Sequence, residues 1–373
     1  MSAKITAERW VLAQRPVGAF SPAEHARKET ETLAVDSIVE SAPAAPAEAP
    51  ASLAAAGPGD VIVKVECLAV DAFLRTMLDE GAFHTTIPIG ATLPAIGYGT
   101  VVWAASGAKQ KVGDRVSGML GAGSYVRVKS EGLMKKMSLP RQEETACLGI
   151  LGVPGLTAYI GINEVAKPPR SGETVVVSAA AGSTGSVAAQ LAKLRGARVI
   201  GIAGGPEKKK YLLEELGLDG VVDYKDASET LEEQLKRECP KGIDFFYDNV
   251  GGKTLDAVLN QINMYARVVI CGAISQYNTG GLYTGGVEGP VNYLKLAEKS
   301  ATMQGFAMFN HTAGMVKAVA WMNYYYYMGK LKFKEDVSTG IEAFPEAMTA
   351  MFAGSYIGRK LIDVSGDLAK KSG

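Results

Sequence analysis

Apolar residues in the second half of the chain alternate between short continuous runs and longer amphipathic stretches. The runs predict buried strands at Thr174–Ala180, Arg198–Ala203, Val221–Tyr224, Asp244–Tyr247 and Arg267–Cys271. The stretches between them predict helices at Gly185–Arg195, Glu207–Leu216, Leu231–Arg237 and Thr254–Ile262. Nearly continuous apolar strands separated by helices are typical of a parallel sheet covered on both faces. The pattern therefore predicts a doubly wound α/β domain.

The pattern before residue 147 is different. Short apolar or alternating runs at Val61–Leu68, Gly99–Trp103 and Arg115–Met119 are separated by turn residues such as Gly107 and Gly113. This spacing is typical of a small, irregular β-barrel or sandwich. The last part of the chain, which we expect to return to this first domain, predicts helices and strands at Thr312–Met328, Lys332–Val337, Phe344–Ala353 and Lys360–Val364.

The segment Ser41–Pro58 differs from the rest of the chain because alanine and proline alternate along it. Proline lacks a backbone donor and blocks the preceding helical turn, so the segment fits neither a helix nor a central strand. We expect it to be an exposed connector with polyproline character.

Charge and composition exclude several classes of protein. The 373 residues contain 39 Lys and Arg and 39 Asp and Glu, so the formal net charge is zero. Nucleic-acid binding normally requires a basic excess, and we expect no nucleic-acid partner. No apolar run is long enough to span a membrane, and charged residues precede any apolar run at the N-terminus. We expect no membrane partner and a cytoplasmic location.

Cysteine and histidine are sparse and lack the spacing of metal ligands. The four cysteines, Cys67, Cys147, Cys239 and Cys271, lie far apart with no C-x-x-C pair. The three histidines, His25, His84 and His311, are isolated. We therefore expect no metal site, and we expect structural roles for the histidines.

The turn after the first predicted strand of the α/β domain carries the clearest chemical signal. Ala180, Gly182 and Gly185 have the spacing A-x-G-x-x-G between a strand and a helix. Gly182 would let the backbone approach a pyrophosphate, and Gly185 would let the helix pack closely on the strand. The N-terminus of the helix supplies free N–H donors for the anion. The turn predicts a dinucleotide site.

The end of the second strand indicates which dinucleotide binds. A site specific for NAD usually places a carboxylate there, but this strand ends at Ala203, Gly204 and Gly205. The next helix begins with Pro206 and Glu207, followed by the lysines 208–210. Lysine charge near this turn suits the 2′-phosphate of NADP(H), although at least one of the three lysines must face solvent.

Several motifs in order resemble those of one family, the zinc-independent medium-chain dehydrogenase/reductases. The resemblance is to the branch of prostaglandin reductases, leukotriene B4 12-hydroxydehydrogenases, curcumin reductases and plant double-bond reductases. The motifs are Leu148–Tyr159 (LGILGVPGLTAY), Ala179–Gly185, Glu207–Lys208, Asp223–Lys225, Tyr247–Gly252 (YDNVGG) and Cys271–Asn278 (CGAISQYN). The resemblance implies a Rossmann domain at 148–322, a GroES-like barrel domain at 1–147 and 323–373, and a homodimer.

The resemblance also implies roles for individual residues. Gly182, Ser183, Thr184 and Gly185 would hold the pyrophosphate, and Lys208 and Tyr224 the 2′-phosphate. Asn249 would lie by the nicotinamide half. The cofactor would be wrapped by Cys271, Gly272, Ala273, Ile274, Ser275 and Tyr277, and the nicotinamide pocket lined by Phe306, Ala307 and Met308. Tyr277 is also the candidate catalytic residue.

Two positions depart from the family pattern. Phe73 stands where the family often has tyrosine, which removes a hydroxyl near the substrate. Tyr356 stands where the family has an asparagine that contacts the cofactor, so that contact is not carried over.

The resemblance implies NADPH-dependent reduction of a carbon–carbon double bond conjugated to a carbonyl. Developing negative charge on the carbonyl oxygen needs a hydrogen-bond donor, and a neutral phenol such as Tyr277 suits that role or proton delivery. Tyr277 could instead only contact the cofactor. Three other functions are alternatives: zinc-dependent alcohol oxidation, quinone reduction, and NADPH binding without turnover. The first is disfavoured, because the Cys67–Arg75 region lacks a His and Glu ligand set.

Overall fold

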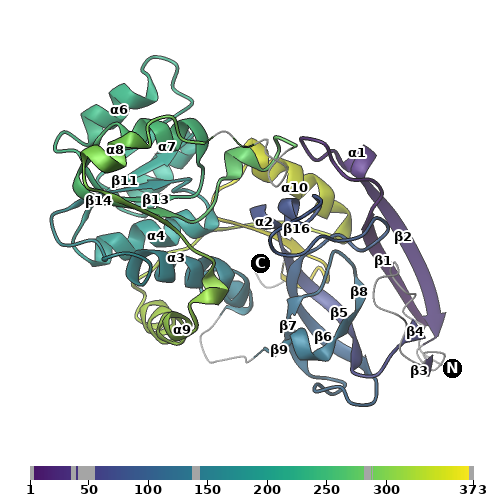
Figure 1. The fold of residues 1–373 in the computed structure, drawn as a ribbon. Helices are drawn as coiled ribbons and strands as arrows, with labels where there is room; N and C mark the ends of the chain where they lie inside the picture. The colour runs from purple at the N-terminus through teal and green to yellow at the C-terminus, as the bar shows by residue number, and fades with distance from the viewer. Residues whose placement is uncertain are drawn as a thin grey trace.

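A computed structural model describes residues 4–34, 39–40, 55–136, 143–280, 287 and 289–368. The chain forms two lobes, each built around its own sheet (Figure 1). One sheet is wholly parallel, and we call its lobe the parallel-sheet lobe. The other sheet is mostly antiparallel, and we call its lobe the mixed-sheet lobe.

The parallel-sheet lobe has six strands in the order β12-β11-β10-β13-β14-β15. Their bounds are Thr174–Ser178 (β10), Arg198–Ala203 (β11), Gly220–Asp223 (β12), Ile243–Asp248 (β13), Ile262–Ile270 (β14) and Thr302–Gly305 (β15). Every neighbouring pair is parallel. The strand order reverses between β10 and β13, and the carboxyl ends of strands at such a switch point form a natural binding crevice.

Helices cover both faces of this sheet. They are Val153–Asn163 (α3), Ser183–Leu194 (α4), Pro206–Lys210 (α5), Leu231–Glu238 (α6), Gly252–Leu259 (α7), Leu294–Glu298 (α8) and Thr312–Tyr327 (α9). Successive strand residues point to opposite faces. Val175 and Val177 join a core with α3, α4 and α9, whereas Val176 joins a core with α6 and α7. The doubly wound arrangement predicted from the sequence is therefore present.

The mixed-sheet lobe contains seven strands in the order β16-β17-β5-β6-β7-β9, with β8 paired to β5. Their bounds are Asp60–Ala69 (β5), Ile96–Ala104 (β6), Arg115–Met119 (β7), Tyr125–Lys129 (β8), Met134–Lys135 (β9), Glu335–Thr339 (β16) and Arg359–Asp363 (β17). The C-terminal strand β17 pairs antiparallel with β5, so the end of the chain completes this sheet. The helices Ala72–Thr76 (α2) and Phe344–Ala353 (α10) contact each other.

The N-terminal part forms a long antiparallel hairpin that the hydrophobic pattern did not predict. Its strands are Lys4–Leu12 (β1) and Ala26–Ala34 (β2), with the short helix Pro22–His25 (α1) between them. The second strand, ARKETETLA, is mostly charged and polar, so it lacks an apolar alternation. Trp10 anchors the hairpin, since its indole N–H donates to the carbonyl of Ile341 at 2.9 Å.

Other predictions need smaller corrections. The predicted helix 207–216 is α5 followed by a separate π-helical turn, Tyr211–Glu215. The predicted helix 254–262 ends at Leu259, because β14 already begins at Ile262. Most of the Ala/Pro segment, residues 41–54, lies outside the described residues. At its end, Ala55–Ala56 (β4) pairs with Val39–Glu40 (β3), and Ala56 is buried, so this part is not an exposed connector.

Candidate functional site

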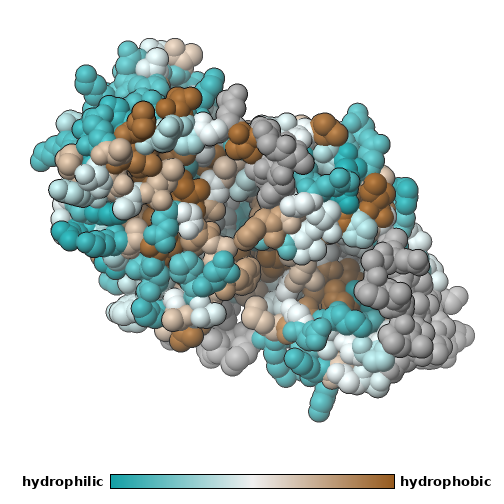
Figure 2. All heavy atoms as spheres, in the orientation of Figure 1, coloured by the Kyte–Doolittle hydropathy of each residue, from teal (hydrophilic) through white to brown (hydrophobic). Residues whose placement is uncertain are grey.

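A cleft of about 2040 Å³ lies between the two lobes, at the carboxyl ends of the parallel strands. Apolar side chains follow the hollow between the lobes (Figure 2). All of the predicted cofactor residues and Tyr277 line this cleft: Gly182, Ser183, Thr184, Gly185, Lys208, Tyr224, Asn249, Cys271, Gly272, Ala273, Ile274, Ser275, Tyr277, Phe306, Ala307 and Met308. Residues far apart in the sequence thus meet around one space.

The Gly-rich turn joins β10 to α4. Ala179 has φ of +48°, in the left-handed region, and this reverses the chain directly after the strand. A Cβ on Gly185 would lie 2.3 Å from the carbonyl oxygen of Ala179, so only glycine fits. Gly182 is the N-cap residue of α4, and the first backbone N–H groups of that helix have no partner within the helix. These groups make the turn a ready site for a pyrophosphate.

Lys208 and Tyr224 lie together near the start of α5. A Cβ on Gly354 would be 3.3 Å from Nζ of Lys208 and 3.8 Å from the hydroxyl of Tyr224. Burial, and to a smaller extent the neighbouring Lys225, lowers the pKa of Lys208, and no carboxylate among the described residues contributes to it. Lys209 and Lys210 do not line the cleft. One half-buried lysine without an acidic partner suits a phosphate.

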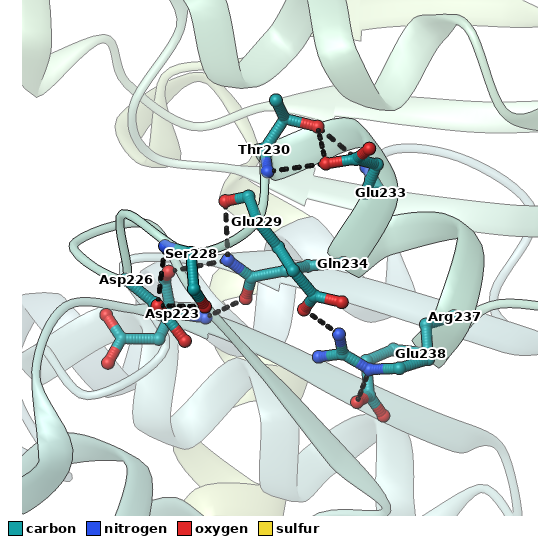
Figure 3. A network of polar contacts seen from close by, with 9 residues as sticks. All are labelled: Asp223, Asp226, Ser228, Glu229, Thr230, Glu233, Gln234, Arg237 and Glu238. Carbon is teal, nitrogen blue, oxygen red and sulfur yellow. Dashed lines mark hydrogen bonds and ion pairs between the residues drawn. The ribbon is translucent and has the colours of Figure 1, made fainter.

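A network of polar contacts holds the backbone beside Tyr224 (Figure 3). The backbone N–H of Asp223 donates to Gln234 at 2.8 Å, and the Gln234 amide donates back to the Asp223 carbonyl at 2.9 Å. The carboxylate of Asp223 accepts from the backbone N–H of Gly205 at 2.8 Å. The network therefore ties the end of β12 to the turn that precedes Lys208.

The end of β13 is organised by Asp248, which is fully buried. Its carboxylate accepts from the hydroxyl of Ser178 at 2.8 Å and from the backbone N–H groups of Val250 and Gly251 at 2.9 and 3.1 Å. Burial raises the pKa of Asp248, although these donors lower it. Asn249 follows, and its side-chain amide donates to the carbonyl of Ser178 at 2.7 Å. This fixes Asn249 at the mouth of the switch point.

Residues 271–280, which we call the Tyr277 loop, follow β14 into the cleft. The backbone N–H of Cys271 donates to the carbonyl of Asp248 at 2.8 Å, and that of Ile274 to the carbonyl of Asn249 at 3.0 Å. Burial raises the pKa of the Cys271 thiol to about 12, so the thiol is neutral at physiological pH. The hydroxyl of Tyr277 accepts from the backbone N–H of Ala273 at 3.1 Å, which orients the phenol within the loop.

The mixed-sheet lobe lines the cleft with five apolar side chains and one histidine, which together we call the substrate wall: Phe73, Phe83, Ile87, Met119, Leu120 and His84. His84 lies between two aromatic rings, with centroids 5.1 Å from both Phe73 and Phe83. Burial lowers the pKa of His84. His84 therefore lines the cleft rather than a core, in contrast to the structural role expected. His25 does fit that expectation, because it is 6% exposed and accepts a backbone hydrogen bond from Ser21.

The C-terminal segment 354–359 crosses the Gly-rich turn. The sequence singles out only Tyr356 in this segment. The backbone N–H of Gly358 donates to the carbonyl of Ala181 at 2.8 Å. Tyr356 lines the cleft, and burial raises its pKa, so the phenol is neutral. Arg359 is 3% exposed and pairs with Asp71 of the mixed-sheet lobe through both carboxylate oxygens. No local motif indicated this pair, which lies 288 residues apart in the chain.

The comparisons with known proteins agree with this geometry. The family described as "Zinc-binding dehydrogenase" matches residues 183–323. The NADPH-dependent curcumin reductase of Escherichia coli (strain K12) is 34% identical over 96% of this chain and 97% of its own length. The 2-alkenal reductase (NADP(+)-dependent) of Nicotiana tabacum is 37% identical over 83% of this chain and 88% of its own. The crystal structure of CurA in complex with NADPH from Vibrio vulnificus has a TM-score of 0.80 at 31% identity, covering 96% of this chain and 99% of that chain.

The class follows from the fold, the cleft and these relatives: the chain belongs to the medium-chain dehydrogenase/reductases, and the predicted fold class is confirmed. Within that family it is a member of the double-bond reductase branch, whose members are NADP(H)-dependent oxidoreductases. In the described part of the chain, no group of three or more His, Cys, Asp or Glu side chains is placed to hold a metal ion. Nor does any helix there have the length and apolar character needed to cross a membrane.

Proposed function

We propose that this protein reduces the carbon–carbon double bond of α,β-unsaturated aldehydes and ketones with NADPH. The observation that carries the proposal is the position of the Tyr277 loop. Its first residues are hydrogen-bonded to Asn249 at the carboxyl edge of the parallel sheet, and Asn278 is hydrogen-bonded to α2, the helix that carries the cleft-lining Phe73. Relatives named as curcumin, 2-alkenal and pulegone reductases support this class of substrate.

NADP(H) is the cofactor, and the described residues fit it. The free N–H groups at the start of α4 suit its pyrophosphate, and Lys208 with Tyr224 suits the 2′-phosphate. Asn249 and the segment Phe306–Met308 line the same cleft, and in this proposal they hold the nicotinamide half. When bound, NADPH supplies the hydride that adds to the β-carbon of the substrate.

The remaining chemistry falls to the protein's own residues. Negative charge develops on the substrate's carbonyl oxygen, where a preorganised donor stabilises the transition state. Tyr277 is our candidate donor or acid, because it is a phenol in the cleft whose hydroxyl is oriented by Ala273. The buried Leu120 and the partly buried Phe73 and Ile87 give the cleft an apolar lining, and low local polarity strengthens such a hydrogen bond. The neutral Cys271 thiol has little nucleophilic character toward an electrophilic substrate.

A substrate panel tests the proposal. The purified protein is mixed with NADPH and an alkenal, an alkenone or a benzoquinone, and NADPH oxidation is followed together with product analysis by mass spectrometry and NMR. We expect the saturated carbonyl compound, with deuterium at the β-carbon when C4-deuterated NADPH is used. Hydroquinone formation without alkene reduction would show a quinone reductase instead. NADPH binding without oxidation on any of these substrates would show a protein that binds the cofactor without turnover.

We also propose that the protein forms a homodimer through the outer edge of β15. This strand ends the six-stranded sheet in the described part of the chain, and all four of its residues are exposed. Apolar side chains near it are exposed as well, including Leu294 at 66% and Tyr265 at 71%. An open strand edge beside exposed apolar residues favours pairing with a second copy. Light scattering of the purified protein measures the oligomeric state.

The division into domains at 148 and 323 and the cytoplasmic location stay predictions.

A further inference from the structure

Arg75 is a buried arginine in α2, next to the substrate wall, and its side chain is 0% exposed. Its guanidinium donates to acceptors from three separate stretches of chain. Nη1 donates to the carboxylate of Asp79 at 2.7 Å, Nη2 to the carbonyl of Gly18 at 2.6 Å, and Nε to the side-chain oxygen of Asn278 at 3.1 Å. Asn278 follows Tyr277 directly, so the arginine is bonded to the loop that carries the candidate catalytic residue.

The three bonds have different consequences. Asp79 lies one turn along from Arg75, so this pair compensates the buried charge locally. The bonds to Gly18 and Asn278 span 57 and 203 residues of chain, so they join distant segments. The backbone there is closely packed, because a Cβ on Gly280 would lie 3.1 Å from the backbone nitrogen of Gly18. The far end of the Tyr277 loop is therefore held against the mixed-sheet lobe.

The near end of the same loop is held by the parallel-sheet lobe. Asp248 and Asn249 accept hydrogen bonds from the backbone of residues 271, 272 and 274. Tyr277 thus lies between one anchor on each lobe. Helix α2 carries both Arg75 and the wall residue Phe73, two positions apart. The hydrogen bond from Arg75 to Asn278 therefore holds the residue next to Tyr277 at a fixed distance from the helix that carries Phe73.

We propose that Arg75 is a positioning residue, which holds the Tyr277 hydroxyl at the distance from the substrate wall that the reaction requires. The proposal rests on the function proposed above. Misplacing a reacting group by about 1 Å can cost about 100-fold in rate. Losing the Arg75 bond should therefore lower kcat, while the affinity for NADPH, which depends on the Gly-rich turn and Lys208, is retained.

The test uses variants that remove or keep the bond. Arg75→Met and Asn278→Leu each remove it, whereas Asn278→Asp keeps an acceptor oxygen at the same place. We expect the first two to lower kcat by about 10- to 100-fold with KM for NADPH nearly unchanged, and Asn278→Asp to keep most of the activity. Adding Arg75→Met to Tyr277→Phe should cost little more than Tyr277→Phe alone, because a residue that acts through the Tyr277 hydroxyl has no further effect once that hydroxyl is removed.

A matched control separates positioning from stability. Arg267 is also a mostly buried arginine, which donates to both oxygens of the Glu173 carboxylate in the parallel-sheet lobe and does not line the cleft. Arg267→Met should lower Tm without lowering kcat per folded molecule. The proposal is overturned if Arg75→Met behaves in the same way, or if Tyr277→Phe costs as much in the Arg75→Met background as in the wild type.

Hydrogen exchange gives a readout that needs no turnover. With NADPH bound, we expect the peptide covering residues 271–280 to exchange faster in Arg75→Met and Asn278→Leu than in the wild type and in Arg267→Met. Equal exchange in all four proteins would overturn the proposal. If the wild type reduces none of the substrates in the panel, the proposed function fails, and the exchange comparison still decides whether Arg75 holds the loop.

Discussion

At the Gly-rich turn, the cleft is lined by the backbone of one short stretch, residues 179–185, whereas around Tyr277 it is lined by side chains from segments about 200 residues apart. The turn needs close approach, so its residues are small and its donors are main-chain N–H groups. The Tyr277 end needs a phenol, an apolar wall and anchors on both lobes. The two ends should therefore respond differently to substitution: one through cofactor affinity, the other through the rate of reaction.

The largest effect is expected at the Tyr277 end. Tyr277→Phe removes the hydroxyl and should lower kcat by about 100-fold or more, since a positioned acid contributes about 10²–10⁴. NADPH affinity, measured by fluorescence titration, should change little. Unchanged turnover together with unchanged affinity would show that Tyr277 is not catalytic, and a large loss of affinity would place it in cofactor binding instead.

At the Gly-rich turn, Gly185→Ala should lower NADPH affinity by about 100-fold, because the added Cβ would lie 2.3 Å from the Ala179 carbonyl oxygen and must push helix α4 away from the strand. Gly132→Ala is the matched control, since its Cβ would meet no atom within 4 Å. Isothermal titration with NADPH compares the two. Wild-type affinity in Gly185→Ala would mean that this turn is not the pyrophosphate site.

The phosphate end gives a smaller and more selective effect. Lys208→Ala should weaken NADPH binding by about 10- to 100-fold, the value of a charge-assisted hydrogen bond, and leave NADH binding unchanged. Lys209→Ala is the control, because Lys209 is exposed and does not line the cleft. Dissociation constants of NADPH and NADH, measured for both variants and the wild type, show whether Lys208 contacts the 2′-phosphate. Equal losses for NADPH and NADH would argue against contact with the 2′-phosphate.

The smallest effect is expected from pH, at the substrate wall. Burial lowers the pKa of His84 below its ordinary 6.5, so the imidazole is neutral at pH 7 and gains a proton only as the pH falls below that value. A charged imidazole between Phe73 and Phe83 should weaken binding of an apolar enone, so KM should rise a few-fold in acid. His84→Gln should remove this rise. A KM profile that is identical in both proteins would exclude the imidazole as its cause.

Much of the parallel-sheet lobe could be predicted because its signals are local. The A-x-G-x-x-G spacing occupies one short stretch of chain, and the strand end without a carboxylate and Lys208 occupy another. Local backbone geometry follows from neighbouring residues. Each predicted cofactor residue lines the cleft. Their contacts with the cofactor stay predictions.

The hairpin of β1 and β2 and the cleft position of His84 were not predicted, for a common reason. The sequence ARKETETLA has no apolar face, so its strand is stabilised by pairing with β1 and by the anchor of Trp10 rather than by its own pattern. A histidine flanked by Phe83 has no signal that distinguishes a core from a cleft. Both features depend on which surfaces meet after folding.

The sequence by itself determined the doubly wound sheet, the Gly-rich turn and the choice of NADP(H), because strand periodicity, glycine conformation and charge at one turn are properties of short stretches. The tertiary structure alone decided how Tyr277 is held. Arg75, Gly18 and Asn278 carry no mutual signal along the chain, and their meeting depends on how two separately formed sheets pack against each other. Packing between distant segments is fixed by the whole fold, whereas a turn is fixed by its neighbours.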